Sequence, residues 1–260
     1  MKLKIYVANA FSAEKFGGNP AAVVPLREWL SDTLMQQIAA QNNLAETAFI
    51  IPRGEDYSIR WFTPVVEVSL CGHATLASAH VLFEHLGYKR EQLIFHSKSG
   101  PLLVTRNQDK ITLDFPADEP ERISDVELID KALGIKPNAV FKSQFDYMVV
   151  LECQKDIETL KPDLVLISKL SSRGLIVTAK GVEVDFVSRC FFPQSGIDED
   201  PVTGSAHFVM VPYWARQIGK NKLSAIQLSA RRGYLDCELA GDRVLISGQA
   251  HTYLEGDFYI

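Results

Sequence analysis

Two short segments of the sequence combine glycine with side chains that can move protons. The first is Cys71-Gly72-His73, and the second is DEDPVTGSAH at residues 198–207. Thiol, imidazole, hydroxyl and carboxylate groups can all donate, accept or relay protons. The two segments therefore indicate acid–base chemistry. The acidic DEDP run has a second interpretation, as a flank that complements a helix dipole.

Each of these segments opens a predicted helix bounded by glycines. Residues 72–87 read GHATLASAHVLFEHLG and residues 204–219 read GSAHFVMVPYWARQIG. Free N–H groups in a helix's first turn, the missing Cβ of glycine and the helix dipole all favour a bound anion. If two such helix ends face each other, a small carboxylate substrate could be held by backbone donors from both. Ordinary turn chemistry would also explain a single glycine before a helix.

The two glycine-bounded segments belong to a longer internal repeat. IRWFTP at residues 59–64 matches SRCFFP at residues 188–193, which places Arg60 on Arg189. The other matched pairs are Phe62 with Phe191, Pro64 with Pro193, Gly100 with Gly233 and Asp109 with Asp242. A collinear set of matches with small changes in offset indicates a duplicated unit. We expect similar domains at residues 1–116 and 121–250, and a final strand at 251–260 that could rejoin the first domain.

The local pattern predicts an α+β fold. Short apolar segments such as AAVVPL and TAFIIP indicate strands, and the two glycine-bounded helices have no polar face. Each sheet should therefore curl around its own buried helix. Ser31 and Ser124 are predicted N-caps of two further helices, and Gly134 is the predicted end of the second. Pro212 should kink its helix or shorten it on the N-terminal side.

Composition excludes several classes of function. The chain has 260 residues, a net charge of −5 and a pI of about 5.7, which argues against a nucleic-acid partner. Its four widely spaced cysteines form no CxxC pair, so neither a zinc site nor a disulfide framework is expected. With no signal peptide or apolar span in the sequence, we expect a cytoplasmic protein without a membrane partner. No P-loop or GxGxxG motif is present, so no cofactor is expected. Exposed strand edges would permit a homodimer.

Four motifs give the sequence a specific resemblance. GGNPAAVV at 17–24, NLAETAFI at 43–50, FTPVVEVSLCGHATLASAH at 62–80 and DEDPVTGSAH at 198–207 resemble the phenazine-biosynthesis-protein (PhzF-like) family. The resemblance implies a diaminopimelate-epimerase-like fold. In that fold two similar domains each wrap a mostly antiparallel sheet around a central helix, and the active site lies between them.

The resemblance also implies roles for particular residues. Glu46 would be the general acid and base, and His73, Asp200 and Ser205 would be its hydrogen-bonding and proton-relaying partners. The implied reaction is an isomerisation, in which a proton leaves one carbon and returns elsewhere without a metal or organic cofactor. The backbone N–H groups of two glycines would bind the substrate carboxylate, namely those of Gly72 and Gly204.

The surroundings of Glu46 in the sequence agree with this role. It is the only charged residue of NLAETAFII and directly precedes an apolar strand. A partly buried carboxyl group can both take and give a proton near neutral pH. The repeat places Leu175 near the position in the second half that matches Glu46. A base is therefore present in one half only. A single base suits a hydrogen shift better than a stereochemical inversion. Without the resemblance, a surface residue between a helix and a strand would be the favoured interpretation of Glu46.

The role of Cys71 stays open. Related epimerases and racemases use two facing thiols, but the second copy has Val202 and Thr203 in the corresponding place and no cysteine. At a helix N-terminus the Cys71 thiol is a candidate for a lowered pKa, so it could be a second proton carrier or simply a small filler. In the GGNP turn, Asn19 could reach the substrate. His73 and His207 lack a third ligand, so no metal is expected.

Three hypotheses follow. The first is a cofactor-independent isomerase that acts on a small carboxylate through Glu46. The second is an amino-acid racemase or epimerase that uses Cys71 as a second base. The third is a binding or regulatory protein that keeps the ligand site without catalysis.

Overall fold

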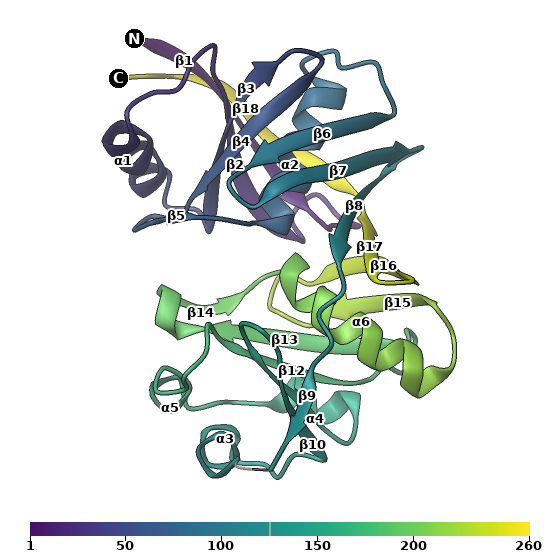
Figure 1. Cartoon of the computed structure of the whole chain (residues 1–260). Helices are drawn as coiled ribbons and strands as arrows, with labels where there is room; N and C mark the ends of the chain where they lie inside the picture. Colours follow the sequence, from purple (N-terminus) through teal and green to yellow (C-terminus); the bar gives the residue numbers. More distant parts are fainter. Residues whose placement is uncertain (125) are drawn as a thin grey trace. The chain divides into compact units, whose positions relative to one another are not determined.

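A computed structural model describes residues 1–124 and 126–260 of the protein. The chain divides into two compact units, shown in Figure 1. Unit 1 consists of residues 1–114 and 247–260, and unit 2 consists of residues 115–246. The chain therefore leaves unit 1 once and returns to it once. Within the described part of the chain, no helix has the length and apolar character needed to cross a membrane.

Unit 1 is built on strands that surround one helix and carry another on their outer face. Its strands are β1 (Lys2–Ala10), β2 (Asn19–Pro25), β3 (Glu46–Arg53), β4 (Asp56–Phe62), β5 (Glu67–Val68), β6 (Gln92–Ser97), β7 (Gly100–Asn107), β8 (Lys110–Pro116) and β18 (Ala250–Tyr259). Its helices are α1 (Asp32–Asn42) and α2 (Gly72–Glu84). The last residues of β8 already belong to unit 2.

Unit 2 has a similar set of strands and more short helices. Its strands are β9 (Glu121–Ile123), β10 (Ala139–Lys142), β11 (Tyr147–Val150), β12 (Leu175–Lys180), β13 (Phe186–Phe192), β14 (Ile197–Asp200), β15 (Lys222–Gln227), β16 (Gly233–Ala240) and β17 (Arg243–Gly248). Its helices are α3 (Glu127–Leu133), α4 (Gln154–Thr159), α5 (Leu164–Ile167) and α6 (Gly204–Ile218), with a 3₁₀ turn η1 (Pro193–Ser195).

The order of strand pairing is the same in the two units. In unit 1, β1–β2 is antiparallel, β2–β3 parallel, β3–β4 antiparallel, β4–β6 parallel and β6–β7 antiparallel. In unit 2, β10–β11, β11–β12, β12–β13, β13–β15 and β15–β16 follow the same alternation. Both units thus have mostly antiparallel sheets with parallel pairs at matching places. These observations establish the expected α+β class.

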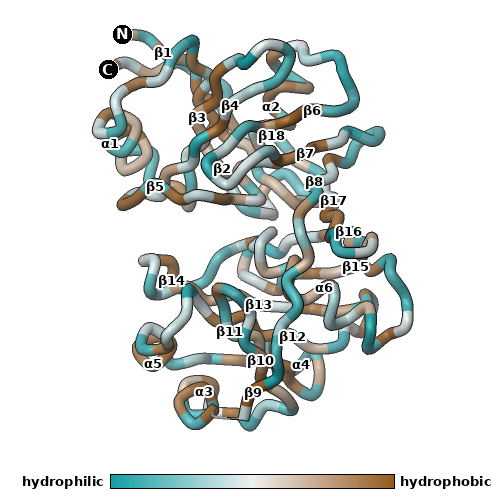
Figure 2. The backbone as a smooth tube through the Cα atoms, in the orientation of Figure 1, coloured by the Kyte–Doolittle hydropathy of each residue, from teal (hydrophilic) through white to brown (hydrophobic). Residues whose placement is uncertain are grey.

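Helix α2 is the buried centre of unit 1, as its apolar circumference predicts. Every residue of α2 except His80 and Glu84 is buried, and the helix packs against β1, β2, β3 and β18. Small residues such as Ala77 and Ala79 allow these strands to approach closely and also favour the helix. In Figure 2, hydrophobic residues are concentrated in the strands, and hydrophilic residues are concentrated at the turns that connect them.

Helix α6 is the corresponding helix of unit 2 and contains Pro212 without interruption. Proline has no N–H group, so the carbonyl of Phe208 loses its partner within the helix. The backbone N–H of Asp118 donates to this carbonyl at 3.1 Å instead. Pro212 therefore does not shorten the helix, because the segment before β9 replaces the missing hydrogen bond. The alternative expectation, a kink at Pro212, stays a prediction.

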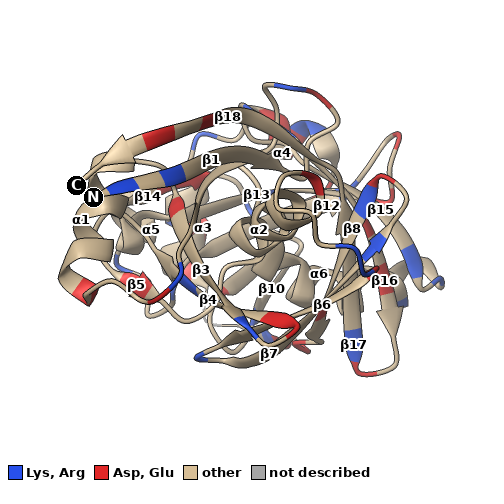
Figure 3. Ribbon diagram, turned by 90° about the horizontal axis from the view of Figure 1, so that it is seen from above, with Lys and Arg blue, Asp and Glu red and all other residues tan. Residues whose placement is uncertain are grey.

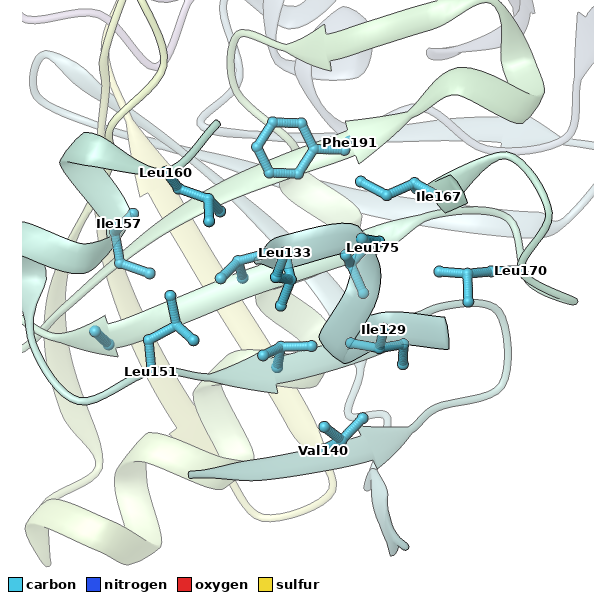
Figure 4. Close-up of a cluster of buried hydrophobic side chains, with 14 of the residues drawn as sticks. Ile129, Leu133, Val140, Leu151, Ile157, Leu160, Ile167, Leu170, Leu175 and Phe191 are labelled. Carbon is cyan, nitrogen blue, oxygen red and sulfur yellow. The ribbon is translucent and has the colours of Figure 1, made fainter. Parts of the chain in front are cut away.

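Short helices cover the outer faces of the sheets. In unit 1, α1 packs on β2 and β3 through a cluster that includes Met35, Ile38 and Phe49. In unit 2, α3, α4 and α5 supply a larger cluster against β10 to β13 (Figure 4). Residues such as Leu133, Ile157 and Phe191 meet there. Each sheet is thus covered on its outer face by helices other than the central helix of its unit.

The predicted helix ends were partly correct. Ser31 is the N-cap of α1, where its hydroxyl accepts from the N–H of Leu34 at 3.3 Å, and Gly134 ends α3 in the left-handed conformation. Ser124 is not an N-cap, because α3 begins only at Glu127 and Val126 precedes it. Asp125, within the predicted helix, lies outside the described residues.

Two arginines at matching positions of the repeat, Arg60 in β4 and Arg189 in β13, form ion pairs with the short strands β5 and β14. Nε and Nη2 of Arg60 donate to the two carboxylate oxygens of Glu67 at 2.8 and 2.7 Å. The same atoms of Arg189 donate to Glu199 at 2.7 and 2.8 Å. The repeat signal in IRWFTP and SRCFFP therefore marks a shared structural ion pair with bidentate geometry.

Strand β18 closes unit 1 by pairing with β1. Each residue from Lys2 to Ala10 has a partner in β18, in an antiparallel register with one bulge. In Figure 3, basic residues of β1 lie beside acidic residues of β18. Nζ of Lys2 lies 3.0 Å from Oδ2 of Asp257. Exposed ion pairs of this kind add little to the free energy of unfolding. The backbone pairing therefore carries the connection.

Candidate active site

Glu46 is placed by the junction between α1 and β3. Asn43 caps the C-terminus of helix α1 in a left-handed backbone conformation with φ of 51°, and the chain then turns into the strand. Glu46 is the first residue of β3 and pairs in parallel register with Ala21 of β2. Its side chain is only 12 % exposed. The carboxylate is thus held at the edge of the buried interior rather than on an open surface.

His73, in the first turn of α2, lies between a carboxylate and a thiol. Its Nε2 is 3.0 Å from Oε2 of Glu46, and its Nδ1 is 3.6 Å from Sγ of Cys71. Burial lowers the pKa of His73, but the Cys71 and Glu46 side chains outweigh burial and raise the pKa well above its ordinary value. Of these two groups, the Glu46 carboxylate is the one that favours a protonated imidazole at neutral pH, because Cys71 contributes only as a thiolate and its own pKa is raised.

Asn19 reaches the same imidazole from the GGNP turn. Gly18 has a φ of 67°, and a Cβ there would lie 2.3 Å from the carbonyl oxygen of Ala10, so the turn requires glycine. The turn places the fully buried Asn19 with Nδ2 at 3.2 Å from Nδ1 of His73. An amide can donate to a neutral imidazole or, turned over, accept from a protonated one. Asn19 therefore orients His73; contact with a substrate stays a prediction.

Cys71 is the residue before α2, but its environment is the opposite of the one expected. The side chain is buried and makes no capping hydrogen bond. Burial raises the pKa of the Cys71 thiol, and the nearby Glu46 carboxylate raises it further. The expected lowering of its pKa was wrong because removal from water outweighs the helix terminus. The group is a neutral thiol at neutral pH.

Glu46, Cys71 and His73 have the side chains of a metal site, with one donor atom from each lying within 4.8 Å of the others. Their contacts do not point to a single centre, however. Glu46 faces Nε2 of His73 whereas Cys71 faces Nδ1. The imidazole thus connects a carboxylate and a thiol through opposite nitrogens, an arrangement suited to the transfer of a proton along the three groups.

Asp200 lies in unit 2, where a small hydrogen-bonded network holds it before α6. The hydroxyl of Thr203 donates to Oδ2 of Asp200 at 2.5 Å. The amide of Gln227 donates to the carbonyl of Asp200 at 2.7 Å and accepts from the N–H of Thr203 at 2.8 Å. Asp200, Thr203 and Gln227 are all buried. The network fixes the chain that leads to Gly204, the first residue of the helix.

Ser205, on the first turn of α6, contacts an arginine that sequence reasoning missed. Nη2 of Arg173 donates to Oγ of Ser205 at 3.0 Å, and Nε of Arg173 donates to Asp146 at 3.0 Å. Asp146 is buried, with its side chain 1 % exposed. A signal for Arg173 was available, because it precedes the apolar strand GLIVTA much as Glu46 precedes TAFII. Thr203, Gln227 and Asp146 had no comparable local signal.

The two central helices share one more feature near their starts. The hydroxyl of Thr75 donates to the carbonyl of Cys71 at 2.5 Å in α2. Nδ1 of His207 donates to the carbonyl of Thr203 at 2.8 Å in α6. Each side chain thus binds the carbonyl of the residue preceding its own helix. In this arrangement the ring of His207 is used to hold the start of α6.

Comparison with known proteins identifies the family. The family model described as phenazine biosynthesis-like protein matches residues 8–256. The chain belongs to this family. A relative from Pseudomonas aeruginosa, named an uncharacterized isomerase, is 50 % identical over 256 residues that cover 98 % of each chain. The resemblance seen in the four sequence motifs is thereby confirmed.

Solved structures extend the comparison to the fold. A PhzF-family protein from Enterococcus faecalis has a TM-score of 0.97 at 45 % identity and covers all of both chains. A hydroxyproline epimerase from Agrobacterium vitis has a TM-score of 0.65 at 9 % identity, over 98 % of this chain and 92 % of that one. The second likeness concerns the fold alone. This phenazine biosynthesis-like protein thus has the expected diaminopimelate-epimerase-like fold.

Proposed function

We propose that this isomerase of the phenazine biosynthesis-like family moves a proton on a small carboxylate substrate, with Glu46 as general acid and base. The C–H bond beside an activating group breaks and its proton passes to the Glu46 carboxylate. The electron pair moves into the neighbouring double-bond system. The carboxyl proton of Glu46 can exchange with solvent, and Glu46 then gives a proton to a different carbon, so neither an oxidant nor a leaving group is needed.

The observation that carries the proposal is the contact between Glu46 and His73. A carboxylate with a 12 % exposed side chain lies 3.0 Å from an imidazole whose pKa is raised well above its ordinary value. A protonated His73 ring balances the negative charge of Glu46 while Glu46 acts as the base, and the two side chains remain neighbours when the carboxyl group carries a proton. In this proposal Asp200 and Ser205 are further hydrogen-bonding and proton-relaying groups. The first-turn N–H groups at Gly72 and Gly204 bind carboxylate oxygens.

A racemase with two thiols is less well supported. Cys71 precedes α2, but Thr203 precedes α6, and its hydroxyl is engaged by Asp200. The raised pKa of Cys71 also disfavours a thiolate base at neutral pH. One carboxylate that takes up a proton and later returns one does not require a thiol.

Deuterium incorporation distinguishes the hypotheses. The protein is incubated in heavy water with a panel of small amino and hydroxy acids, and exchange into carbon is followed by mass spectrometry. The proposal expects exchange that Glu46→Gln abolishes and Cys71→Ser retains. Loss in both variants supports two bases. Thermal stabilisation by a panel compound without exchange supports a binding protein and contradicts the proposal.

A further inference from the structure

Arg173 differs from the structural arginines of this chain in how its guanidinium is used. In Arg189, Nε and Nη2 bind Glu199 and Nη1 donates to the carbonyls of Ile157 and Leu160, which leaves the side chain 15 % exposed. In Arg173, the hydrogen bonds use Nε and Nη2, and the side chain is 37 % exposed. Among the described residues no group hydrogen-bonds to its Nη1. Arg173 is therefore anchored on one side and open on the other.

The side chain of Arg173 is held by contacts additional to those that fix its backbone. The backbone N–H of Arg173 already donates to the carbonyl of Phe145 at 2.8 Å, and Tyr147 donates to the carbonyl of Gly174 at 3.1 Å. These bonds hold the start of β12 beside the start of β11. The side chain adds a bidentate ion pair with the buried Asp146 and lies over the ring of Phe192, at 5.2 Å from its centroid. Together these contacts fix the direction of the guanidinium.

The contact with Ser205 determines what its hydroxyl can do. A guanidinium carries donors only, so Oγ of Ser205 must accept from Arg173 and its own hydrogen must point elsewhere. The adjacent positive charge also makes the hydroxyl a stronger donor. Ser205 is the second residue of α6, where the first-turn N–H groups likewise favour a negative partner.

We infer that Arg173, held by Asp146, is a positioning residue that presents the Ser205 hydroxyl as a hydrogen-bond donor to a carboxylate oxygen of the substrate. This inference rests on the proposed function for its substrate class. In this inference, the hydrogen-bonded residues Asp146, Arg173 and Ser205 make the site bind an anionic group more tightly than a neutral group of the same shape. The effect belongs to binding, and therefore to KM, more than to the proton transfer by Glu46.

The test is a double-mutant cycle with Arg173→Gln, Ser205→Ala and the double variant, plus Arg173→Lys. Arg216→Gln is the control, since Arg216 is an exposed arginine on the same helix, paired with Glu119. Oxalate and its neutral diamide oxamide are binding probes in calorimetry. The KM and kcat for deuterium exchange are measured with the panel compound that the wild type exchanges fastest.

We expect Arg173→Gln and Ser205→Ala each to weaken oxalate binding and raise KM by about tenfold, with kcat changed much less. The double variant should be no worse than either single variant, because one acts through the other. Arg173→Lys should recover part of the loss, and Arg216→Gln should match the wild type. Oxamide binding should be weak and unaffected.

Several results would overturn the inference. Additive losses in the double variant would show that Arg173 acts without Ser205, and equal behaviour of Arg173→Gln and Arg216→Gln would show that it has no role. Failure of the wild type to bind oxalate would also overturn it. If the wild type exchanges no panel compound, the proposed function fails, and the oxalate cycle alone then decides the role of Arg173.

Discussion

Glu46 and Leu175 occupy the same position in the strand pairing of their units, but only Glu46 can ionise. Glu46 opens β3 where it pairs in parallel register with β2, and Leu175 opens β12 where it pairs in the same way with β11. Leu175 is completely buried. The first residue of the matched strands is thus a core residue in β12 of unit 2 and the candidate base in β3 of unit 1.

Replacement of this base should stop the chemistry without unfolding the protein. Glu46→Gln keeps the shape of the side chain but cannot accept a proton, so we expect deuterium exchange to fall by about 10²- to 10⁴-fold. Glu55→Gln is the control, because Glu55 is an exposed partner of Arg90. Mass spectrometry of exchange and thermal melting of both variants would check this. Exchange retained in Glu46→Gln would rule out Glu46 as the base.

The charge on His73 should depend on Glu46. Because the carboxylate helps to raise the pKa of His73, Glu46→Gln should lower that pKa. Nitrogen-detected NMR titration of the His73 ring measures the shift directly. The stabilisation from the charged ring should be complete below about pH 6.5 and should be lost as the pH rises through the raised folded-state pKa. The pKa of His80, about 4 through burial, should stay unchanged as an internal control. An unchanged His73 titration would contradict the coupling.

The thiol of Cys71 should be inert at neutral pH. Burial raises its pKa, so we expect iodoacetamide at pH 7.5 to modify the exposed Cys153 well before Cys71. Peptide mass spectrometry after timed quenching separates the two sites. Cys71→Ala should keep exchange within a few fold of the wild type. Rapid alkylation of Cys71 together with loss of exchange would favour the two-base racemase instead.

The proposed parts of the site were unequally predictable from sequence. Strands β2 and β3 and helix α2 follow from dense apolar runs with clear boundaries, and the position of Glu46 before β3 follows from the same pattern. The short β9, α4 and α5 carry no such signal, since they depend on packing against distant strands. Arg173 precedes a strand as Glu46 does, but its role was missed because its partners Asp146 and Ser205 lie 27 and 32 residues away. The pKa of Cys71 was misjudged because local sequence does not reveal burial.

His207 should make the protein sensitive to acid. Burial lowers the pKa of His207 to about 4, whereas the unfolded chain has a value near 6.5. The neutral ring therefore contributes about 3 kcal/mol to the free energy of unfolding above about pH 6.5. This contribution is lost as the pH falls towards 4. His207→Asn keeps a donor for the Thr203 carbonyl but removes the titration. Urea unfolding at pH 7.0, 5.5 and 4.5 should show a smaller loss for the variant. An equal loss would mean that His207 is not a source of the sensitivity.

Two glycine variants should separate steric crowding from backbone strain. Gly18 and Gly87 have φ angles of 67° and 70°, but only at Gly18 would a Cβ meet other atoms closely. We expect Gly87→Ala to cost about 1 kcal/mol. Gly18→Ala should cost about 2 kcal/mol or more and should displace Asn19. Urea denaturation gives both values. Equal costs would mean that the turn can relax around the added methyl group.

The pairing of β1 with β18 has a consequence for biosynthesis. Every residue from Lys2 to Ala10 has its partner among the last residues of the chain, whereas residues 115–246 already contain all of unit 2. A ribosome moving along the message therefore finishes the second unit while the first still lacks a strand. The part of the protein that carries Glu46 is translated first and completed last, so a nascent chain stopped before residue 247 would leave the exposed edge of β1 open to chaperones or to aggregation.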